Sequence, residues 1–174
     1  MRTILTHRVK LPLVLGLIPL LIGIACSQSA NPSGLELRRA PLTGLKGVVV
    51  TIEPSERLSK TGLTIAGLTS EVESELRENG VSVLTDFQQE QGALYVGVNV
   101  LMMPGDTSFS YNINVEVWQA AALVRNPQQS LIATTWSSGS IGFAGRSTVK
   151  DAIRKVIEDH VGDFITDYRA VNPQ

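Results

Sequence analysis

The chain has 174 residues, with 15 Lys and Arg against 16 Asp and Glu, one cysteine and two histidines. Its first 25 residues hold three of the basic residues and no acidic one, so the remainder carries 12 basic against 16 acidic side chains. This acidic balance argues against a protein that binds nucleic acid, or that docks on anionic lipid by charge. One cysteine excludes an intramolecular disulfide and, with so few histidines, leaves no usual ligand set for structural zinc.

The amino-terminal segment has the layout of a secretory signal. Arg2, Arg8 and Lys10 form a positive start, and residues 11–25 follow without any charge. This apolar run is shorter than the roughly 20 residues that a membrane-spanning helix needs, and prolines and glycines interrupt it. We therefore expect residues 1–25 to be a signal peptide.

The signal ends in Ile22-Gly23-Ile24-Ala25-Cys26, which resembles the lipobox of bacterial lipoproteins. The resemblance implies that the Cys26 thiol receives a diacylglycerol, that the signal is cut before Cys26, and that the new terminus is acylated, with palmitate as the expected group. Ser27, in place of an aspartate, implies the outer membrane. Two alternatives stay open: an ordinary cleaved signal, which gives a secreted or soluble periplasmic protein, and an uncleaved anchor.

Residues 26–44 are predicted to be a flexible tether, because Ser, Asn, Gln, Pro and Gly dominate them. A coil of about 18 residues reaches roughly 23 Å, which would hold a domain off a membrane without releasing it. Residues 45–174 then form one domain, long enough to bury its own core.

The domain is predicted to open with a strand, a helix and a second strand. The β-branched run of residues 47–53 indicates a buried strand that Pro54 ends. Asn79-Gly80 is typical of a helix end, and residues 81–84 predict the short second strand. The helix between them is indicated by apolar residues three and four apart, namely Ile65, Leu68, Val72 and Leu76.

Alternation with a period of two marks the middle of the chain. Residues 93–103 predict a strand, and after a turn, residues 109–117 place apolar and polar side chains on opposite faces of another. From Trp118 the phase of the alternation changes, which indicates a bulge or burial of both faces. A turn at residues 125–130 and a last strand at residues 131–137 are predicted to follow.

The chain closes with a predicted amphipathic helix from Val149 to Tyr168, with Asp167 on its polar face. The order β-α-β-β-β-β-α predicts an α+β fold with two helices on one face of a mostly antiparallel sheet. Behind a lipobox, this order is similar to the small α/β domains of envelope lipoproteins that activate cell-wall synthases, and of those related to the curli secretion lipoprotein. Residues 163–173 also resemble the ends of uncharacterised bacterial envelope proteins. No binding residues carry over from either resemblance.

A glycine-rich segment, residues 138–147, is predicted to be a loop between the last strand and the last helix. Gly139, Gly142, Gly145 and Arg146 form a possible anion loop, because backbone amides ahead of a helix can cradle phosphate. Their spacing fits neither the Walker A nor the dinucleotide motif. The alternative is a turn, or close packing, that only glycine permits.

His160 is the only histidine outside the predicted signal, and Asp159 and Asp163 lie near it on the same helix. A general base needs a nucleophile or a carboxylate that the fold places beside it. The alternative is a histidine that only packs in the core.

Four aromatic residues on neighbouring predicted strands form a possible partner surface: Trp118, Trp136, Tyr95 and Tyr111. Exposed aromatic clusters mark surfaces that bind partners or ligands. If the helices cover this face, the same residues belong to the core.

These features predict a non-enzymatic, lipid-anchored periplasmic module that binds another envelope protein and forms a homo-oligomer in one version of the hypothesis. No cofactor, metal or catalytic residue is assigned to it. The alternative is a small-ligand carrier or hydrolase that uses the Gly139–Arg146 loop and His160, and that version requires Arg146 and His160 to share one pocket.

Overall fold

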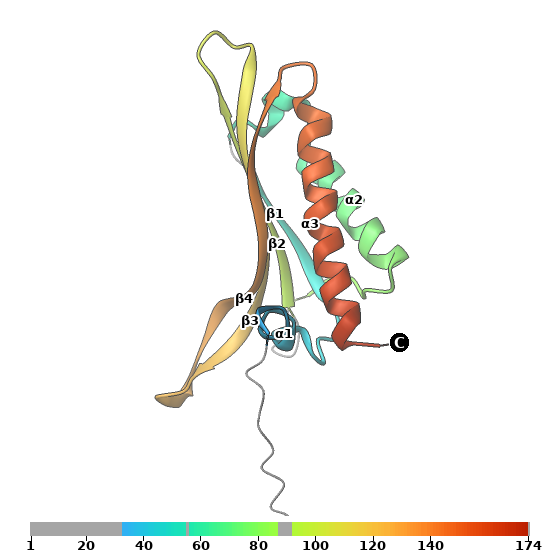
Figure 1. Ribbon diagram of the computed structural model, residues 1–174, viewed down its shortest axis with the longest axis vertical. Helices are drawn as coiled ribbons and strands as arrows, with labels where there is room; N and C mark the ends of the chain where they lie inside the picture. The colour runs from blue at the N-terminus through green and yellow to red at the C-terminus, as the bar shows by residue number, and fades with distance from the viewer. Residues whose placement is uncertain (1–32, 55, 87–91, 174) are drawn as a thin grey trace, which may run out of the picture. The chain divides into compact units, whose positions relative to one another are not determined.

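A computed structural model describes residues 33–54, 56–86 and 92–173, so the predicted signal and Cys26 lie outside the described residues. One four-stranded sheet carries helices on one face (Figure 1). Its strands, in chain order and in spatial order, are β1 (Val48–Pro54), β2 (Gly92–Met102), β3 (Ser108–Leu123) and β4 (Asn126–Gly145). β1 and β2 are parallel and the other pairs are antiparallel, which confirms the predicted fold class.

Two long helices cover the inner face of the sheet. α2 (Ile65–Glu78) packs on β1, and α3 (Val149–Val171) packs on β3 and β4. α3 buries the stripe that its sequence predicts, because residues three and four apart share one face, whereas α2 buries Leu68, Val72 and Leu76 but leaves Ile65 exposed at its start. Thr64 begins α2 by accepting a hydrogen bond from the Gly67 N–H through its side chain.

The short second strand of the prediction is reduced to one bridge. Val83 pairs in parallel with Val48, whose N–H donates to the Ser82 carbonyl at 2.9 Å and whose carbonyl accepts from the Leu84 N–H at 2.9 Å. The chain bends at residues 85–86, so the pairing does not extend.

The predicted change of phase at Trp118 is a bulge between β3 and β4. Val117 pairs with Trp136 and Trp118 pairs with Thr134, which leaves Thr135 as the extra residue. Past the bulge the two strands continue as a hairpin, residues 119–133, which we call the arm. β2 does not accompany it, because its pairing with β3 ends at Trp118 (Figure 1).

The predicted turn at residues 125–130 was too long, and the predicted last strand was too short. The turn consists of Val124 and Arg125, and β4 runs from Asn126 through the glycine-rich segment to Gly145. Cross-strand pairing with β3 over this whole length overrides the low strand propensity of the glycines.

Part of the predicted tether is folded. Ser33 and Glu36 form a capping box that starts α1 (Gly34–Arg39), and the 3-10 helix η1 (Ala40–Leu42) follows. Leu42 is fully buried in the core, and its carbonyl accepts a hydrogen bond from the Asn172 side-chain amide at 2.8 Å. The boundary predicted at residue 44 was therefore wrong, since residues 33–44 belong to the domain.

A second 3-10 helix, η2 (Leu58–Thr61), connects β1 to α2. No helix in the part of the chain that the structure describes is long and apolar enough to span a membrane.

Candidate functional site

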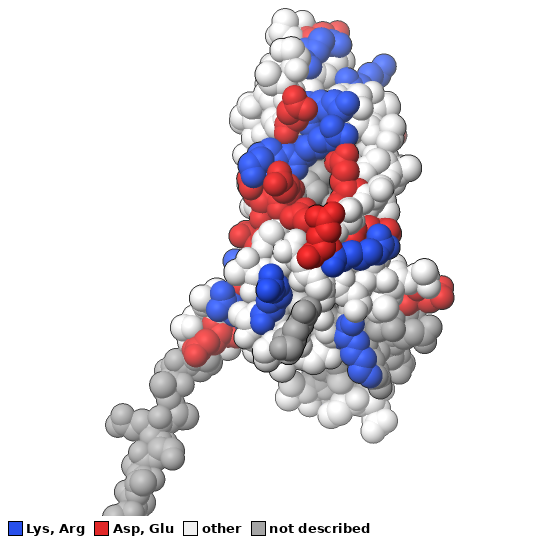
Figure 2. Space-filling model, turned by 90° about the vertical axis from the view of Figure 1, so that its right-hand side faces the viewer, with Lys and Arg blue, Asp and Glu red and all other residues white. Residues whose placement is uncertain are grey.

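The face of the sheet that points away from the helices, which we call the outer face, is nearly free of charge. In the described strands only Glu53 and Glu116 carry a charge on it. The helix layer differs, because acidic and basic side chains gather over its middle (Figure 2). The other side chains of the outer face are polar or apolar: Thr51, Tyr95, Asn99, Leu101, Ser110, Asn112, Asn114, Trp118, Thr134, Ser137, Ile141 and Phe143.

Tyr95 and Trp118 form a stacked pair on the outer face, with ring centroids 4.3 Å apart and planes 12° from parallel. The Trp118 indole N–H donates to Glu116 Oε2 at 2.7 Å, and the Thr134 hydroxyl donates to the same oxygen at 3.1 Å. These bonds fix the orientation of the indole. Stacked, oriented aromatic rings of this kind present a large contact area at a low cost in side-chain entropy.

A shallow groove of about 500 Å³ runs beside this pair, between β3 and β4. Gly139 forms its floor, where a Cβ atom would lie 2.5 Å from Asn114 Oδ1. The Asn114 amide donates to Asn112 Oδ1 at 2.9 Å, and exposed Ile141 borders the groove. Amides and one carboxylate can form hydrogen bonds with a partner, and the apolar side chains can be buried by it.

The four predicted surface aromatics do not form one patch. Tyr95 and Trp118 lie on the outer face, but Trp136 and Tyr111 lie on the inner face with only 2% and 7% of their surface exposed. Trp136 lies on the inner face because it pairs with Val117, an inward residue, on the other side of the bulge from Trp118. Trp136 packs edge-on against Phe164 of α3, at 5.6 Å between ring centroids.

The predicted anion loop is wrong as a loop, since Gly139, Gly142 and Gly145 all lie in β4. A Cβ on Gly142 would overlap the ring of Tyr111, so this glycine makes room for a core side chain. Arg146 closes the β2–β3 turn instead: its N–H donates to the Thr107 carbonyl at 3.0 Å and its Nε to the Asp106 carbonyl at 2.8 Å.

His160 holds α3 against β4. Its Nδ1 lies 2.9 Å from Ser138 Oγ, and its Nε2 lies 2.9 Å from Ser140 Oγ. The Ser138 hydroxyl donates to Asp163 Oδ2 at 2.9 Å, whereas that oxygen is 3.8 Å from the imidazole. The two serines were not predicted as partners, although their spacing of two places both on one face of a strand.

This cluster has the residue types of a nucleophile and a base, but its hydrogen bonds serve to attach α3 to β4. Both ring nitrogens of His160 are occupied by hydroxyls, and Asp163 contacts a serine where a catalytic triad would place it on the imidazole. Arg146 contacts the β2–β3 turn, so the structure does not bring it together with His160.

Asp167 is a buried carboxylate that the sequence pattern placed on the polar face of the helix. Arg38 Nε lies 2.8 Å from its Oδ2 and Arg39 Nε lies 2.7 Å from its Oδ1, while the Trp136 indole donates to Oδ2 at 3.0 Å. Burial raises the pKa of Asp167, but the Trp136 and Arg39 hydrogen bonds and the two arginine charges outweigh it, so the net pKa is lowered. The sequence did contain one signal for the burial of Asp167, namely its position between the apolar residues Phe164 and Tyr168.

A second hollow, of about 230 Å³, lies between α2 and α3. Burial, followed by the charge of Glu158, raises the pKa of Glu75 there to about 6. Arg154 forms a 2.6 Å hydrogen bond with Glu71 beside it. In the described residues, no group of three or more His, Cys, Asp and Glu side chains is arranged to hold a metal ion.

The sequence matches no family model, and no curated protein matches it. Among solved structures, the fold is similar to that of a minor lipoprotein from Acinetobacter baumannii, with 11% sequence identity and a TM-score of 0.30. The alignment covers 70% of this chain and 92% of that chain. A TM-score this low assigns neither a fold nor a function.

Proposed function

We propose that this chain is a non-enzymatic interaction module of the bacterial cell envelope, held by a lipid on Cys26 at the periplasmic side of the outer membrane, that binds another envelope protein. The lipobox-like junction supports the anchor. The observation that carries the binding role is the outer face, which the described helices leave uncovered and which presents the Tyr95–Trp118 pair, the groove, and exposed Ile141 and Phe143.

The edge strand supports the same proposal. β4 pairs only with β3, and none of its 20 residues is charged. Soluble proteins usually protect a sheet edge with lysine, proline or a bulge, because its free N–H and C=O groups can pair with another chain. Between Trp136 and Gly145, β4 has none of these, so its edge and its outer side chains are open to a partner strand.

The chemistry of the candidate site residues favours binding over catalysis. The His160 cluster is satisfied within the domain, and the outer face presents amides, hydroxyls and aromatic rings, with its carboxylate Glu116 engaged by Trp118 and Thr134. Burying Ile141 and Phe143 against a partner contributes about 1.5–3 kcal/mol for each side chain.

Site-specific photo-crosslinking tests the binding surface. A benzophenone side chain at Phe143, in cells that produce the full chain, is expected to give a discrete adduct whose mass identifies the partner. The matched control is the same side chain at Ile65, another exposed apolar residue, which lies on α2 in the helix layer. Equal adducts from both positions, or none from Phe143, would contradict the proposal. An adduct with the mass of two copies of the chain would show that the partner is a second copy, in a homo-oligomer.

A further inference from the structure

We propose that the arm rests its exposed apolar side chains, Val124, Leu131 and Ile132, on the surface of the bilayer that holds the lipid on Cys26. The inference rests on the proposed lipid anchor and adds to it a second contact between this protein and the membrane.

The arm has little charge and several exposed apolar side chains, which flank a polar stretch from Arg125 to Ser130. Its 15 residues, 119–133, carry one charge, on Arg125 at the turn. Val124 is 98% exposed and Ile132 is 53% exposed, and among the described strands none but β3 and β4 takes part in this hairpin. Its further apolar residues are Ala120, Ala121, Ala122, Leu123, Leu131 and Ala133.

A two-stranded ribbon is only marginally stable in water unless a third strand or a helix supports it. The two strands of the arm pair with each other from Gln119 with Ala133 to Leu123 with Asn126, apart from residues 127–129, and the outward backbone groups along both edges can bind water and headgroups at the bilayer surface. What it lacks is cover for its apolar side chains. A bilayer surface supplies such cover without requiring complementary polar groups.

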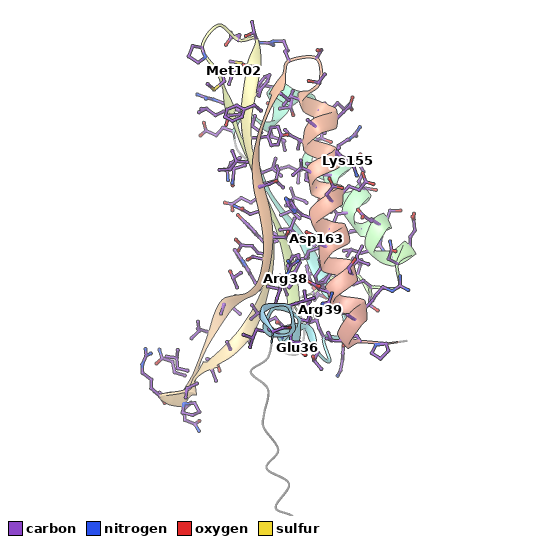
Figure 3. The ribbon with its side chains drawn as sticks, in the orientation of Figure 1. Glu36, Arg38, Arg39, Met102, Lys155 and Asp163 are labelled. Atoms are coloured by element: carbon purple, nitrogen blue, oxygen red, sulfur yellow. The ribbon has the colours of Figure 1, made fainter. Side chains whose placement is uncertain are left out.

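The start of the described chain lies at the base of the arm. The guanidinium of Arg38 in α1 lies 4.9 Å from the centre of the Trp136 ring, and Trp136 is next to the bulge residue Thr135. Figure 1 shows α1 and the arm at the same end of the sheet, and Figure 3 shows Met102 at the opposite end.

The chain from Cys26 to Ser33 and the arm from Trp118 to Val124 have similar maximum lengths. Cys26 precedes Ser33 by seven residues, which span at most about 25 Å when fully extended. From Trp118 to Val124, the arm extends about 20 Å at roughly 3.4 Å per residue. A lipid held in the bilayer by Cys26 therefore keeps α1 close enough to the membrane for the arm to touch it.

The charge pattern favours lipid over a protein surface as the occupant. The arm has no acidic residue, and Arg125 stands directly after Val124, where its aliphatic stem can follow the valine while its guanidinium stays among the headgroups. Because the rest of the mature chain is acidic on balance, charge does not hold the domain on the membrane. The contact is apolar, and we expect it on neutral phosphatidylcholine.

The single cysteine allows a direct test with the mature, lipidated protein in phosphatidylcholine vesicles. Lipid blocks the Cys26 thiol, so Val124→Cys provides the only free thiol, which is labelled with an environment-sensitive fluorophore. We expect a blue shift of its emission and a loss of quenching by aqueous iodide when vesicles are present. The matched control, Ser147→Cys, labels an exposed residue just after Gly145, at the end of the β3–β4 ladder opposite the arm, and is expected to stay quenched.

Three results would overturn the proposal. In the first, the label at residue 124 is as accessible to iodide with vesicles as without them. In the second, the labels at residues 124 and 147 lose accessibility equally. In the third, the label at residue 124 is protected only when envelope proteins are added, and this result would identify a protein as the partner of the arm. Failure of the lipid anchor itself is seen separately: the unsubstituted protein then reacts with the thiol label at Cys26 and does not float with vesicles. Val124→Ser with Ile132→Ser, at exposed positions that leave the core intact, is expected to abolish protection of a label at Leu131→Cys.

Discussion

Glu75 is a carboxylate whose surroundings disfavour its charge. It lies between α2 and α3, and its pKa of about 6 exceeds that of a free glutamate, about 4.3. The folded protein therefore holds the proton more tightly than the unfolded chain does. Its contribution to stability is greatest below pH 4 and is lost as the pH rises through 6.

Replacing Glu75 with glutamine removes this charge while keeping the shape of the side chain. We expect Glu75→Gln to be more stable than the unsubstituted protein at pH 7.5, because the ionised form is no longer buried beside Glu158, and to be equally stable at pH 4.5 within about 0.5 kcal/mol. Urea denaturation at both pH values measures the difference. Glu71→Gln, which loses an ion pair with Arg154, serves as the control and gains no stability at pH 7.5.

Single side chains were the part of the structure least accessible from sequence. Helical periodicity placed Asp167 on the polar face, but α1 and β4 bring Arg39 and Trp136 to it from distant parts of the chain. The partners of His160 were missed for a related reason, since Ser138 and Ser140 were assigned to a loop. A pattern read along one element does not contain the partners that the fold supplies.

At the scale of elements, the glycines of β4 show how packing decides a conformation. Gly142 lies opposite Tyr111, which fills the space above it, whereas Gly145 has no heavy atom closer than 3.8 Å to its would-be Cβ. The two glycines occupy one strand but differ in what an added methyl group would meet.

Gly142→Ala is expected to destabilise the protein by about 1–3 kcal/mol, because the buried Tyr111 ring must move to make room for the methyl group. Gly145→Ala, in the same strand, is expected to be neutral or slightly stabilising, because it restricts the unfolded chain without a clash. Chemical denaturation followed by tryptophan fluorescence measures both. Equal effects would show that backbone freedom, and not the Tyr111 ring, requires glycine at residue 142.

Long elements with a regular period were predicted well. The alternation in β2 and β3, the change of phase at Trp118 and the apolar stripe of α3 all appear in the structure. α1 was missed, although Ser33 and Glu36 have the spacing of a capping box, because six residues give too little periodicity to recognise. The candidate surface was predicted only as far as Tyr95 and Trp118, since the bulge turns Trp136 inward.

At the scale of the whole molecule, Asp167 joins three elements. It lies on α3 and binds Arg38 and Arg39 of α1 and Trp136 of β4, so one carboxylate fixes the amino-terminal helix to the domain. Because its pKa is lowered by folding, its contribution to stability is present above the ordinary aspartate pKa and is lost as the pH falls through the lower value of the folded state.

Asp167→Asn is expected to be less stable than the unsubstituted protein at pH 7 by about 1–3 kcal/mol, since the arginines lose their counter-charge and the buried indole keeps a weaker acceptor. The difference is expected to shrink as the pH falls below the ordinary aspartate pKa, because the unfolded chain then binds a proton at Asp167 that the folded state does not yet bind. Urea denaturation at pH 7 and pH 3 tests this. Asp159→Asn, an exposed partner of Lys155, should show a difference of no more than about 0.5 kcal/mol at either pH.

The attachment of α1 also determines how a mechanical load enters the protein. A force applied to the chain ahead of Ser33 acts first on α1. The arginines of α1 form ion pairs with Asp167 near the end of α3, and η1, which follows α1, buries Leu42 in the core. The load is then carried by ion pairs and a packed side chain before it acts on the hydrogen bonds of β1. Such a force is therefore expected to detach α1, and with it the Arg38 side chain that lies over Trp136, before it disrupts the sheet.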